Sequence, residues 1–244
     1  LSCSGSGGTS SKSLTVVGYR ETQGVTVDGY IRGADIFIDT NENFIADSNE
    51  FSTTSDNDGT FNIRYDDGTL ISLNGFDVDT NTSLENFLIT HKMDGYSEFK
   101  VISPVTTLLQ FFNNPSNVKT SLGIDNSLDI LTFDPVANKS TSTINDYLYE
   151  KGNQLTVLAY TMQNISNNLT NSTETTEDFF SAIAEELESA YNSTQQIVDI
   201  ESKDFITNAL NNVINSKALN TTISNAENIS DSLANMSPII KVYS

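Results

Sequence analysis

The sequence predicts an α+β fold, in which an N-terminal antiparallel β-sandwich is followed by a C-terminal α-helical bundle. Between residues 14 and 102, short apolar or alternating runs are separated by turn residues, which is typical of a sandwich. From 103 to 244, apolar residues recur mostly at spacings of three and four, which is typical of amphipathic helices. With 37% hydrophobic residues, 13 Phe and 9 Tyr, the composition is that of a folded chain.

The strand signal comes from short runs bounded by Asp-Gly, Asn-Gly and Arg-Gly pairs, which favour tight turns. Turns of this kind connect strands that run in opposite directions, so we expect antiparallel pairing. The runs cover 14–19, 25–27, 35–38, 60–65, 70–73 and 87–90.

A helix is expected to begin at Ser103-Pro104, because serine can cap a helix and proline suits its first position. Residues 121–135 are expected to form a structured connector, and helix breaks are expected near 171–173 and 201–202. The apolar stripes are expected to be core. They contain Ile144, Leu148, Leu155, Leu158, Met162, Ile165, Leu169, Phe180, Ile183, Leu187, Tyr191, Ile197, Phe205, Leu210, Val213, Ile214, Leu219, Ile223 and Leu233.

The last seven residues, 238–244, resemble a β-strand after a helical stretch. This strand either folds back onto the sandwich or pairs with an exposed sheet edge of a neighbouring copy. Spacing alone leaves both alternatives open, and it also leaves open whether the bundle packs on the sandwich.

The charge is strongly unbalanced, with 32 acidic and 12 basic residues and a formal net charge of −20. Such a surface repels nucleic acid and anionic lipid, so neither is expected as a direct partner. It attracts divalent cations. The alternative explanation is solubility or adaptation to a salty habitat.

Residues 1–13 have the Ser/Gly-rich composition of a flexible tether. The lone cysteine of the chain, Cys3, follows a small residue and precedes this spacer, as at the junction of a bacterial lipoprotein. We therefore expect Cys3 to carry a lipid, and any membrane contact to be made through that anchor. The alternative is a stray cysteine in an exposed leader.

The strongest motif is an Asx-rich segment at residues 39–50. Its oxygen-bearing side chains fall at positions 1, 3, 5, 9 and 12, the spacing of an EF-hand calcium loop. Ca²⁺ takes six to eight oxygen ligands, and alternate residues of a tight loop point inward. The expected ligands are Asp39, Asn41, Asn43, Asp47 and Glu50 through their side chains and Ile45 through its carbonyl.

Phe44 stands at position 6 of this loop, where EF-hand loops carry glycine. A non-glycine residue there costs about 1–2 kcal/mol if it adopts the same positive-φ backbone. We therefore expect a calcium-binding variant between strands, with its own geometry and a lower affinity. The alternative is a hairpin tip that holds no metal.

Residues 28–39, the acidic loop, and residues 53–61 together resemble the start of small β-sandwich repeats in bacterial surface proteins. These are the SdrD B-like and carboxypeptidase-regulatory-like (prealbumin-type) modules, in which calcium rigidifies the loop. The resemblance implies that Asp56 and Asp58 match a second acidic cluster and add ligands. Phe44 is the departure from the family pattern.

Residues 75–81 and 102–109 resemble a pattern of large extracellular lipoproteins of marine bacteria. The similar stretches together cover about residues 30–130. This resemblance implies an extracellular or cell-surface location, with an outer-membrane lipid anchor, and it brings no activity with it.

The acid–base inventory argues against an enzyme. The single histidine, His91, lies in a strand-like stretch, and no nucleophile motif, phosphate-binding loop or zinc spacing accompanies it. Two distant carboxylates still suffice for a glycosidase, which needs only oxygen acids.

Three hypotheses follow. The first is a non-enzymatic adhesion or structural module at the cell surface, stiffened by Ca²⁺ and bound to an extracellular partner. The second is a subunit of an extracellular filament or surface layer, which pairs with copies of itself by strand addition. The third is a carbohydrate-binding or carbohydrate-active protein.

Overall fold

The computed structural model describes residues 19–93, 95–137, 142–170 and 173–216. The expected tether with Cys3, the last expected helical stripe and the expected terminal strand lie outside these residues.

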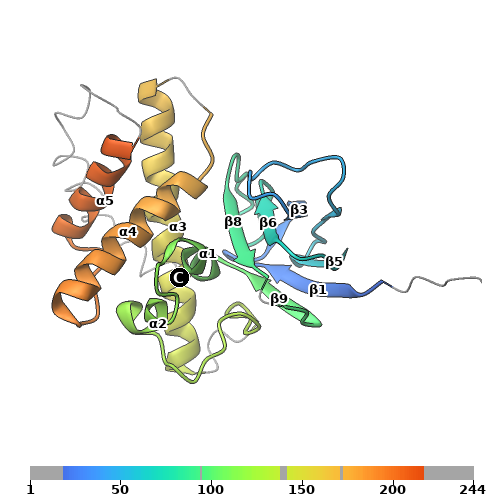
Figure 1. The fold of residues 1–244 in the computed structure, drawn as a ribbon, viewed down its shortest axis with the longest axis horizontal. Helices are drawn as coiled ribbons and strands as arrows, with labels where there is room; N and C mark the ends of the chain where they lie inside the picture. The colour runs from blue at the N-terminus through green and yellow to red at the C-terminus, as the bar shows by residue number, and fades with distance from the viewer. Residues whose placement is uncertain (1–18, 94, 138–141, 171–172, 217–244) are drawn as a thin grey trace, which may run out of the picture.

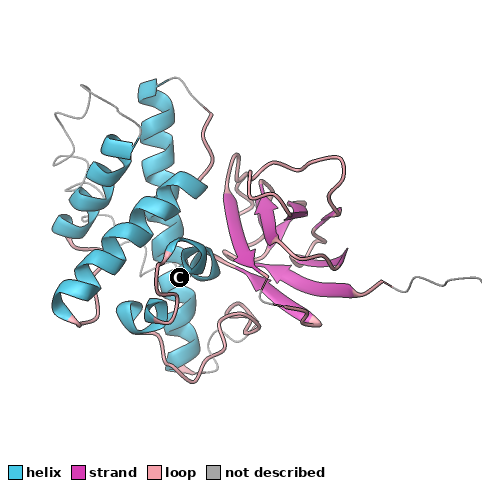
Figure 2. Ribbon diagram, in the orientation of Figure 1, coloured by secondary structure: helices cyan, strands magenta, loops and turns pink. Residues whose placement is uncertain are grey.

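Strands fill the first part of the described chain and helices fill the second, which is an α+β fold (Figures 1 and 2). The strands are β1 (Glu21–Thr26), β2 (Ile31–Arg32), β3 (Asp35–Asp39), β4 (Ser52–Thr54), β5 (Thr60–Arg64), β6 (Thr69–Leu73), β7 (Phe76–Asp77), β8 (Leu88–Lys92) and β9 (Phe99–Ile102). The helices are α1 (Pro104–Phe111), α2 (Asn117–Leu122), α3 (Thr143–Thr170), α4 (Glu177–Thr194) and α5 (Lys203–Ser216).

The strands form sheets in the orders β5-β1-β9 and β4-β3-β6-β8, with β2 and β7 as a separate pair. All pairs of the four-stranded sheet are antiparallel, but β1 and β9 are parallel. The expectation of purely antiparallel pairing is therefore wrong at this pair. Turn residues fix the direction of strands that follow each other in the chain, whereas β9 pairs with a strand far away in sequence.

Side-chain alternation decides which strand faces are buried. In β5, Phe61 and Ile63 are buried, whereas Thr60, Asn62 and Arg64 are exposed. In β3, Ile36 and Ile38 belong to the main core, whereas Phe37 points to the opposite face and joins a second cluster. Hydrophobic clusters therefore cover both faces of β3.

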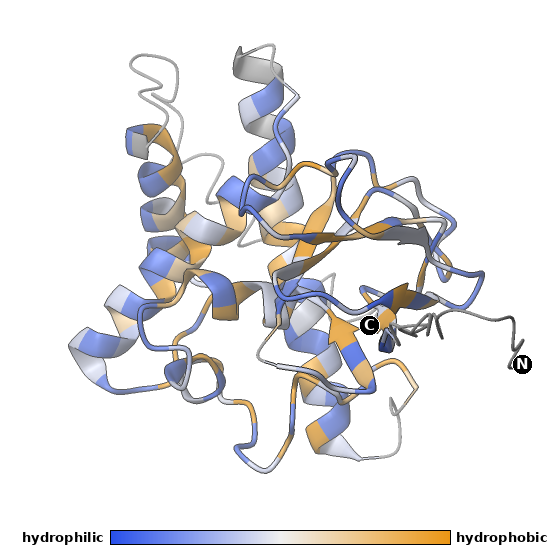
Figure 3. Cartoon of the chain, turned by 45° about the vertical axis from the view of Figure 1, so that its right-hand side comes forward, coloured by the Kyte–Doolittle hydropathy of each residue, from blue (hydrophilic) through white to orange (hydrophobic). Residues whose placement is uncertain are grey.

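The strands and helices share the main hydrophobic core (Figure 3). It joins Ile36 and Ile89 of the sheet to Leu108 of α1, Leu155 of α3 and Phe180 of α4. The helices therefore pack on the sheets, and the boundary expected at residue 103 separates kinds of secondary structure but not hydrophobic cores. Within the described residues, the helices are too short or too polar for any of them to cross a membrane.

Helix α1 begins where the sequence predicts. Ser103 accepts a hydrogen bond from the Thr106 N–H (3.1 Å), and the Thr106 hydroxyl accepts one from the Ser103 N–H (2.8 Å). This reciprocal capping box, with Pro104 as the first helical residue, fixes the start of the helix.

Threonine hydroxyls from two helices bind the backbone edge of β8, which lies next to the helices in Figure 1. The Thr176 hydroxyl accepts from the Leu88 N–H (2.8 Å) and donates to the Leu88 carbonyl (2.7 Å). At Thr90, the N–H donates to the Thr107 hydroxyl (2.8 Å) and the carbonyl accepts from the Thr106 hydroxyl (2.8 Å). These hydroxyls supply the partners that a neighbouring strand would give.

The helical pattern holds with exceptions. Helices α3 and α4 are separated at the expected break, and the short helix α2 lies mostly before the expected connector and overlaps it only at residues 121 and 122. Ile144 and Ile197 were expected in the core but are 42% and 64% exposed. Ile144 lies in the first turn of α3 and Ile197 lies beyond the end of α4, so neither is on a packed helix face.

Replacing Thr176 by valine keeps the shape of the side chain but removes both hydrogen bonds to Leu88. Each buried backbone group left without a partner costs about 1–3 kcal/mol, so we expect a large fall in the free energy of unfolding. Chemical denaturation followed by circular dichroism measures this fall. Thr194→Val is the matched control, because Thr194 is exposed and its hydroxyl bonds only to Ala190 and to Gln196 just beyond the end of the helix. An equal fall in the free energy of unfolding of the two variants would contradict the role of the Thr176 hydroxyl at the edge of β8.

Candidate metal centre

The Asx-rich segment forms the loop that joins β3 to β4. The two strands pair antiparallel, and the Ile38 N–H donates to the Phe51 carbonyl (3.0 Å) at the base of the loop. The loop therefore begins at Asp39 with both ends held by the sheet.

Asp39 lies at the base of the loop with no exposed surface. One carboxylate oxygen accepts from the N–H groups of Asn41 (3.2 Å) and Asn43 (3.3 Å), and the other accepts from the Phe44 N–H (2.7 Å). A buried carboxylate needs such partners, because an unpaired charge away from water is very costly. Asp39 thus organises the first half of the loop around itself.

Asn41, Asn43 and Asp47 converge on one another. The amide nitrogens of Asn41 (2.8 Å) and Asn43 (3.0 Å) both donate to the same Asp47 carboxylate oxygen. The side-chain oxygens accept backbone N–H groups in turn, Asn41 from Asn43 (3.2 Å) and Asn43 from Ile45 (2.8 Å). Partial positive charge from two amides is therefore concentrated on Asp47.

Glu50 closes the loop from its other end. Its carboxylate accepts from the N–H (2.7 Å) and hydroxyl (3.1 Å) of Thr40 and from the N–H of Asp47 (3.1 Å). Glu50 therefore ties the first residues of the loop to the last.

Phe44 adopts a positive φ of 60°, the left-handed conformation that the loop spacing requires at this position. Its ring packs on Phe37, Ile71 and Leu88, which form the second hydrophobic cluster on the face of the sheet opposite the main core. This burial offsets the strain of the backbone and explains why phenylalanine is tolerated where glycine is usual. No local pattern in the sequence predicts this contact.

The donor set fits a hard cation such as Ca²⁺, which prefers carboxylate, amide and carbonyl oxygens. Asp39, Asn41, Asn43 and Asp47 would hold the ion once the two amides turn their oxygens inward, with the carbonyl of Ile45 as a further ligand. A bound Ca²⁺ would supply a fixed positive charge. Among the described residues, however, no three His, Cys, Asp or Glu side chains come together in a group that can hold a metal, so Glu50 would have to leave its present partners to join.

Asp56 and Asp58 do not lie in this loop site. They belong to the turn between β4 and β5, where the Asp58 carboxylate accepts from the hydroxyl (2.6 Å) and N–H (3.2 Å) of Thr60. The register pairs Thr54 with Asp35, so this turn lies at the end of β3 away from Asp39. Four strand residues span about 13 Å, several times a Ca²⁺–oxygen distance. The implied addition of these two ligands is therefore wrong.

His91, in β8, is fully buried. Its Nδ1 donates to the Val101 carbonyl (2.7 Å), and its Nε2 is buried without a hydrogen-bond partner. Burial lowers the pKa of His91 to about 4, with nearby Lys100 acting in the same direction. The ring is therefore neutral and does not reach a substrate from solvent.

Comparisons with known proteins identify no family. No family model matches the chain, and no curated protein matches it. A solved structure with some similarity is that of a 9R-lipoxygenase from Cyanothece PCC8801, at 12% identity and a TM-score of 0.23. The alignment covers 80% of this chain and 28% of the lipoxygenase chain, and similarity this weak carries no conclusion about fold or activity.

Because Phe44 has a positive φ, we expect a glycine variant at this position to be more stable than an alanine variant, which is the reverse of the usual order. Phe44→Ala loses the ring contacts and keeps the strain, whereas Phe44→Gly loses the contacts and relieves the strain. We expect the glycine variant to unfold with a free energy about 1 kcal/mol higher than the alanine variant, measured by urea titration in chelator. Ile45, which has no positive φ, is the control, and there glycine should be the less stable. If the glycine and alanine variants had the same order of stability at positions 44 and 45, backbone strain at Phe44 would be excluded.

The neutral His91 makes the fold sensitive to acid. Because its pKa is lower in the folded chain than in the unfolded chain, protons favour the unfolded state. Above about pH 6.5 the ring is neutral in both states, and His91 does not lower the free energy of unfolding. As the pH falls from there toward 4, this free energy decreases by at most about 1.4 kcal/mol per pH unit. His91→Asn keeps a donor for Val101 and does not titrate, so its unfolding free energy should fall less over this range. Parallel curves for both proteins would contradict the assignment.

Proposed function

We propose that the protein is a non-enzymatic, calcium-binding structural or adhesion module of the cell surface or extracellular space. The observation that carries this proposal is the convergence of Asn41, Asn43 and Asp47 above the buried carboxylate of Asp39. The cation would replace the amide nitrogens as the partner of Asp47 and would lock the loop.

The effect of bound calcium on the rigidity of the fold depends on the contact between Phe44 and the second hydrophobic cluster. A locked loop holds this ring on Phe37 and Leu88, so it covers the outer face of the four-stranded sheet. We further propose that the two larger sheets form a sandwich, because Ile36 and Ile38 of one share the core with Phe61 and Ile63 of the other. Calcium would then stiffen this sandwich from one end.

The location and the partner are supported by sequence. The tether, Cys3 as a lipid anchor and the excess of 20 negative charges agree with a module held outside the cell by its lipid. In that setting the partner is another extracellular molecule. Strand addition receives no support at β8, because Thr106, Thr107 and Thr176 already occupy its backbone edge.

Calcium at saturating concentration should raise the melting temperature relative to chelator, because an ion bound only to the folded state stabilises it. At 100 times Kd the gain is about 2.7 kcal/mol, or roughly 5–10 °C for a domain of this size. Differential scanning calorimetry measures the shift.

Two kinds of variant make the calcium experiment specific. Asp47→Asn keeps the size of the side chain and should abolish the calcium shift, as should Asp39→Ala combined with Glu50→Ala. Asp56→Ala combined with Asp58→Ala removes two carboxylates outside the loop and should retain the shift. Loss of the shift in this control, or no shift in the natural protein, would refute the site.

A further inference from the structure

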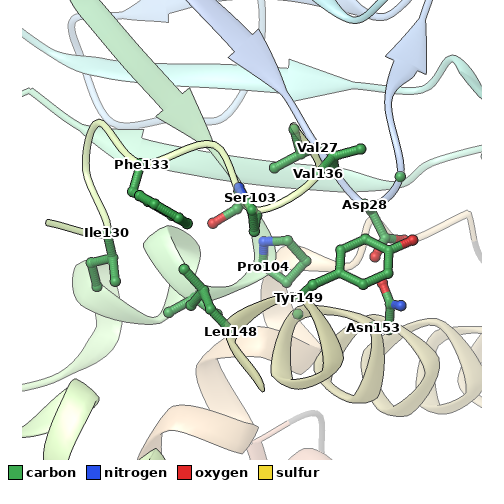
Figure 4. A pocket seen from close by; sticks show the side chains of 14 residues that line it. Val27, Asp28, Ser103, Pro104, Ile130, Phe133, Val136, Leu148, Tyr149 and Asn153 are labelled. Atoms are coloured by element: carbon green, nitrogen blue, oxygen red, sulfur yellow. The ribbon is translucent and has the colours of Figure 1, made fainter. Parts of the chain in front are cut away.

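A groove lies where the sheets meet the helices, and four segments of the chain line it (Figure 4). It encloses about 350 Å³ of space, part of it open to solvent. One end is mainly apolar, with Pro104, Phe133, Val136 and Leu148. We call it the junction groove.

The walls of the junction groove are fixed before any ligand binds. The connector that carries Phe133 and Val136 is held by Asp134, which accepts from the Tyr30 hydroxyl (3.1 Å) and the Val136 N–H (2.8 Å). The start of α1 is fixed by its capping box. A preformed groove binds a ligand without first ordering its own chain.

The other end of the groove is polar. Asp28, Tyr149 and Asn153 lie beside one another there (Figure 4). Thr156 follows one turn along the same face of α3; it is 8% exposed, and its hydroxyl has no hydrogen-bond partner of good geometry. This hydroxyl lies near enough to Asp28 to influence the pKa of its carboxyl.

Gly152, on the same face of α3, leaves space in the groove. Glycine inside a helix costs about 1 kcal/mol relative to alanine. A Cβ at this position would meet no atom of its described surroundings within 4 Å, so close packing does not explain the glycine. The open space is what a ligand would fill.

The electrostatics at this end favour a cation. Burial, and secondarily the negative charge of Asp77, raise the pKa of Asp28 to about 7, although the nearby Thr156 hydroxyl opposes the rise. A positive charge placed at Asp28 would therefore relieve an unfavourable ionisation. The aromatic face of Tyr149 and the net charge of −20 act in the same direction.

We propose that the junction groove binds a small organic cation, a protonated primary amine on a short apolar body, with its ammonium group at Asp28 and its carbons against Pro104 and Val136. The enclosed part of the groove as a whole has room for about one water-sized group, which is the size of an ammonium group. This site shares no residue with the calcium loop, so either proposal can fail without the other.

The experiment is calorimetric titration of the whole chain with n-butylammonium, 1-butanol and butyrate, at constant ionic strength and in the presence of chelator. We expect binding of butylammonium alone. At pH 7 the bound cation should also release part of a proton from Asp28, which appears as a dependence of the heat on the ionisation enthalpy of the buffer. This release should vanish at pH 9, where Asp28 is already ionised.

Variants locate the site. Asp28→Asn should weaken butylammonium binding at least tenfold and abolish the proton release, since a charge-assisted hydrogen bond is lost. Gly152→Leu fills the open space and should weaken binding similarly. Asp66→Asn, which removes an exposed charge from the turn after β5, should change neither.

The outcomes that overturn the proposal are equally distinct. Binding of butanol as tight as that of butylammonium would reveal an apolar cleft with no use for Asp28. Equal weakening by Asp28→Asn and Asp66→Asn would reveal general attraction to a negative protein. No heat of binding at any concentration that leaves the chain folded would exclude the site.

Discussion

Strand β8 is the edge of the four-stranded sheet that meets the helices, and its outward backbone groups need partners because they are buried. Another strand would supply a ladder of N–H and C=O groups. Here threonine hydroxyls supply them, since one hydroxyl can donate and accept at the same residue. Thr176 does both at Leu88, whereas Thr106 and Thr107 divide the two roles at Thr90. These hydroxyl contacts close the edge of the sheet at β8, and they allow α1 and α4 to share a core with that sheet.

Asp39 shows a similar use of side chains in place of regular structure. Its carboxylate is fully buried, and backbone N–H groups of the loop surround it, so the loop has a folded arrangement of its own. Asp39 therefore shapes the first half of the loop through its own hydrogen bonds. What remains open to a cation is Asp47, whose charge is balanced only by two neutral amides. The proposed role of Ca²⁺ is thus to stiffen a loop that Asp39 has already shaped.

Local signals in the sequence predict the change from strands to helices, the start of α1 at Ser103 and the loop after Asp39, because turns, caps and periodicity act between near neighbours. Distant pairings are not encoded in this way. The parallel pairing of β9 with β1 and the hydroxyl contacts of Thr176 each join residues about 75 or more positions apart. The resemblance to surface-protein modules also grouped Asp56 with the loop, although the three residues of β4 carry it to the other end of the sheet. In the sequence, Asp28 resembles an ordinary turn residue, because the burial that raises its pKa exists only in the folded chain.

Leu88 connects the loop to the helices. Its side chain belongs to the cluster on which Phe44 packs, and its backbone is held by Thr176 at the start of α4. Movement of Phe44 away from the sheet would expose Leu88 and loosen the strand that Thr176 binds. Because both contacts meet at one residue, an ion that fixes the loop would also favour the docked position of α4. The loop and the start of α4 therefore meet at the same residue of β8, although they lie far apart in the sequence.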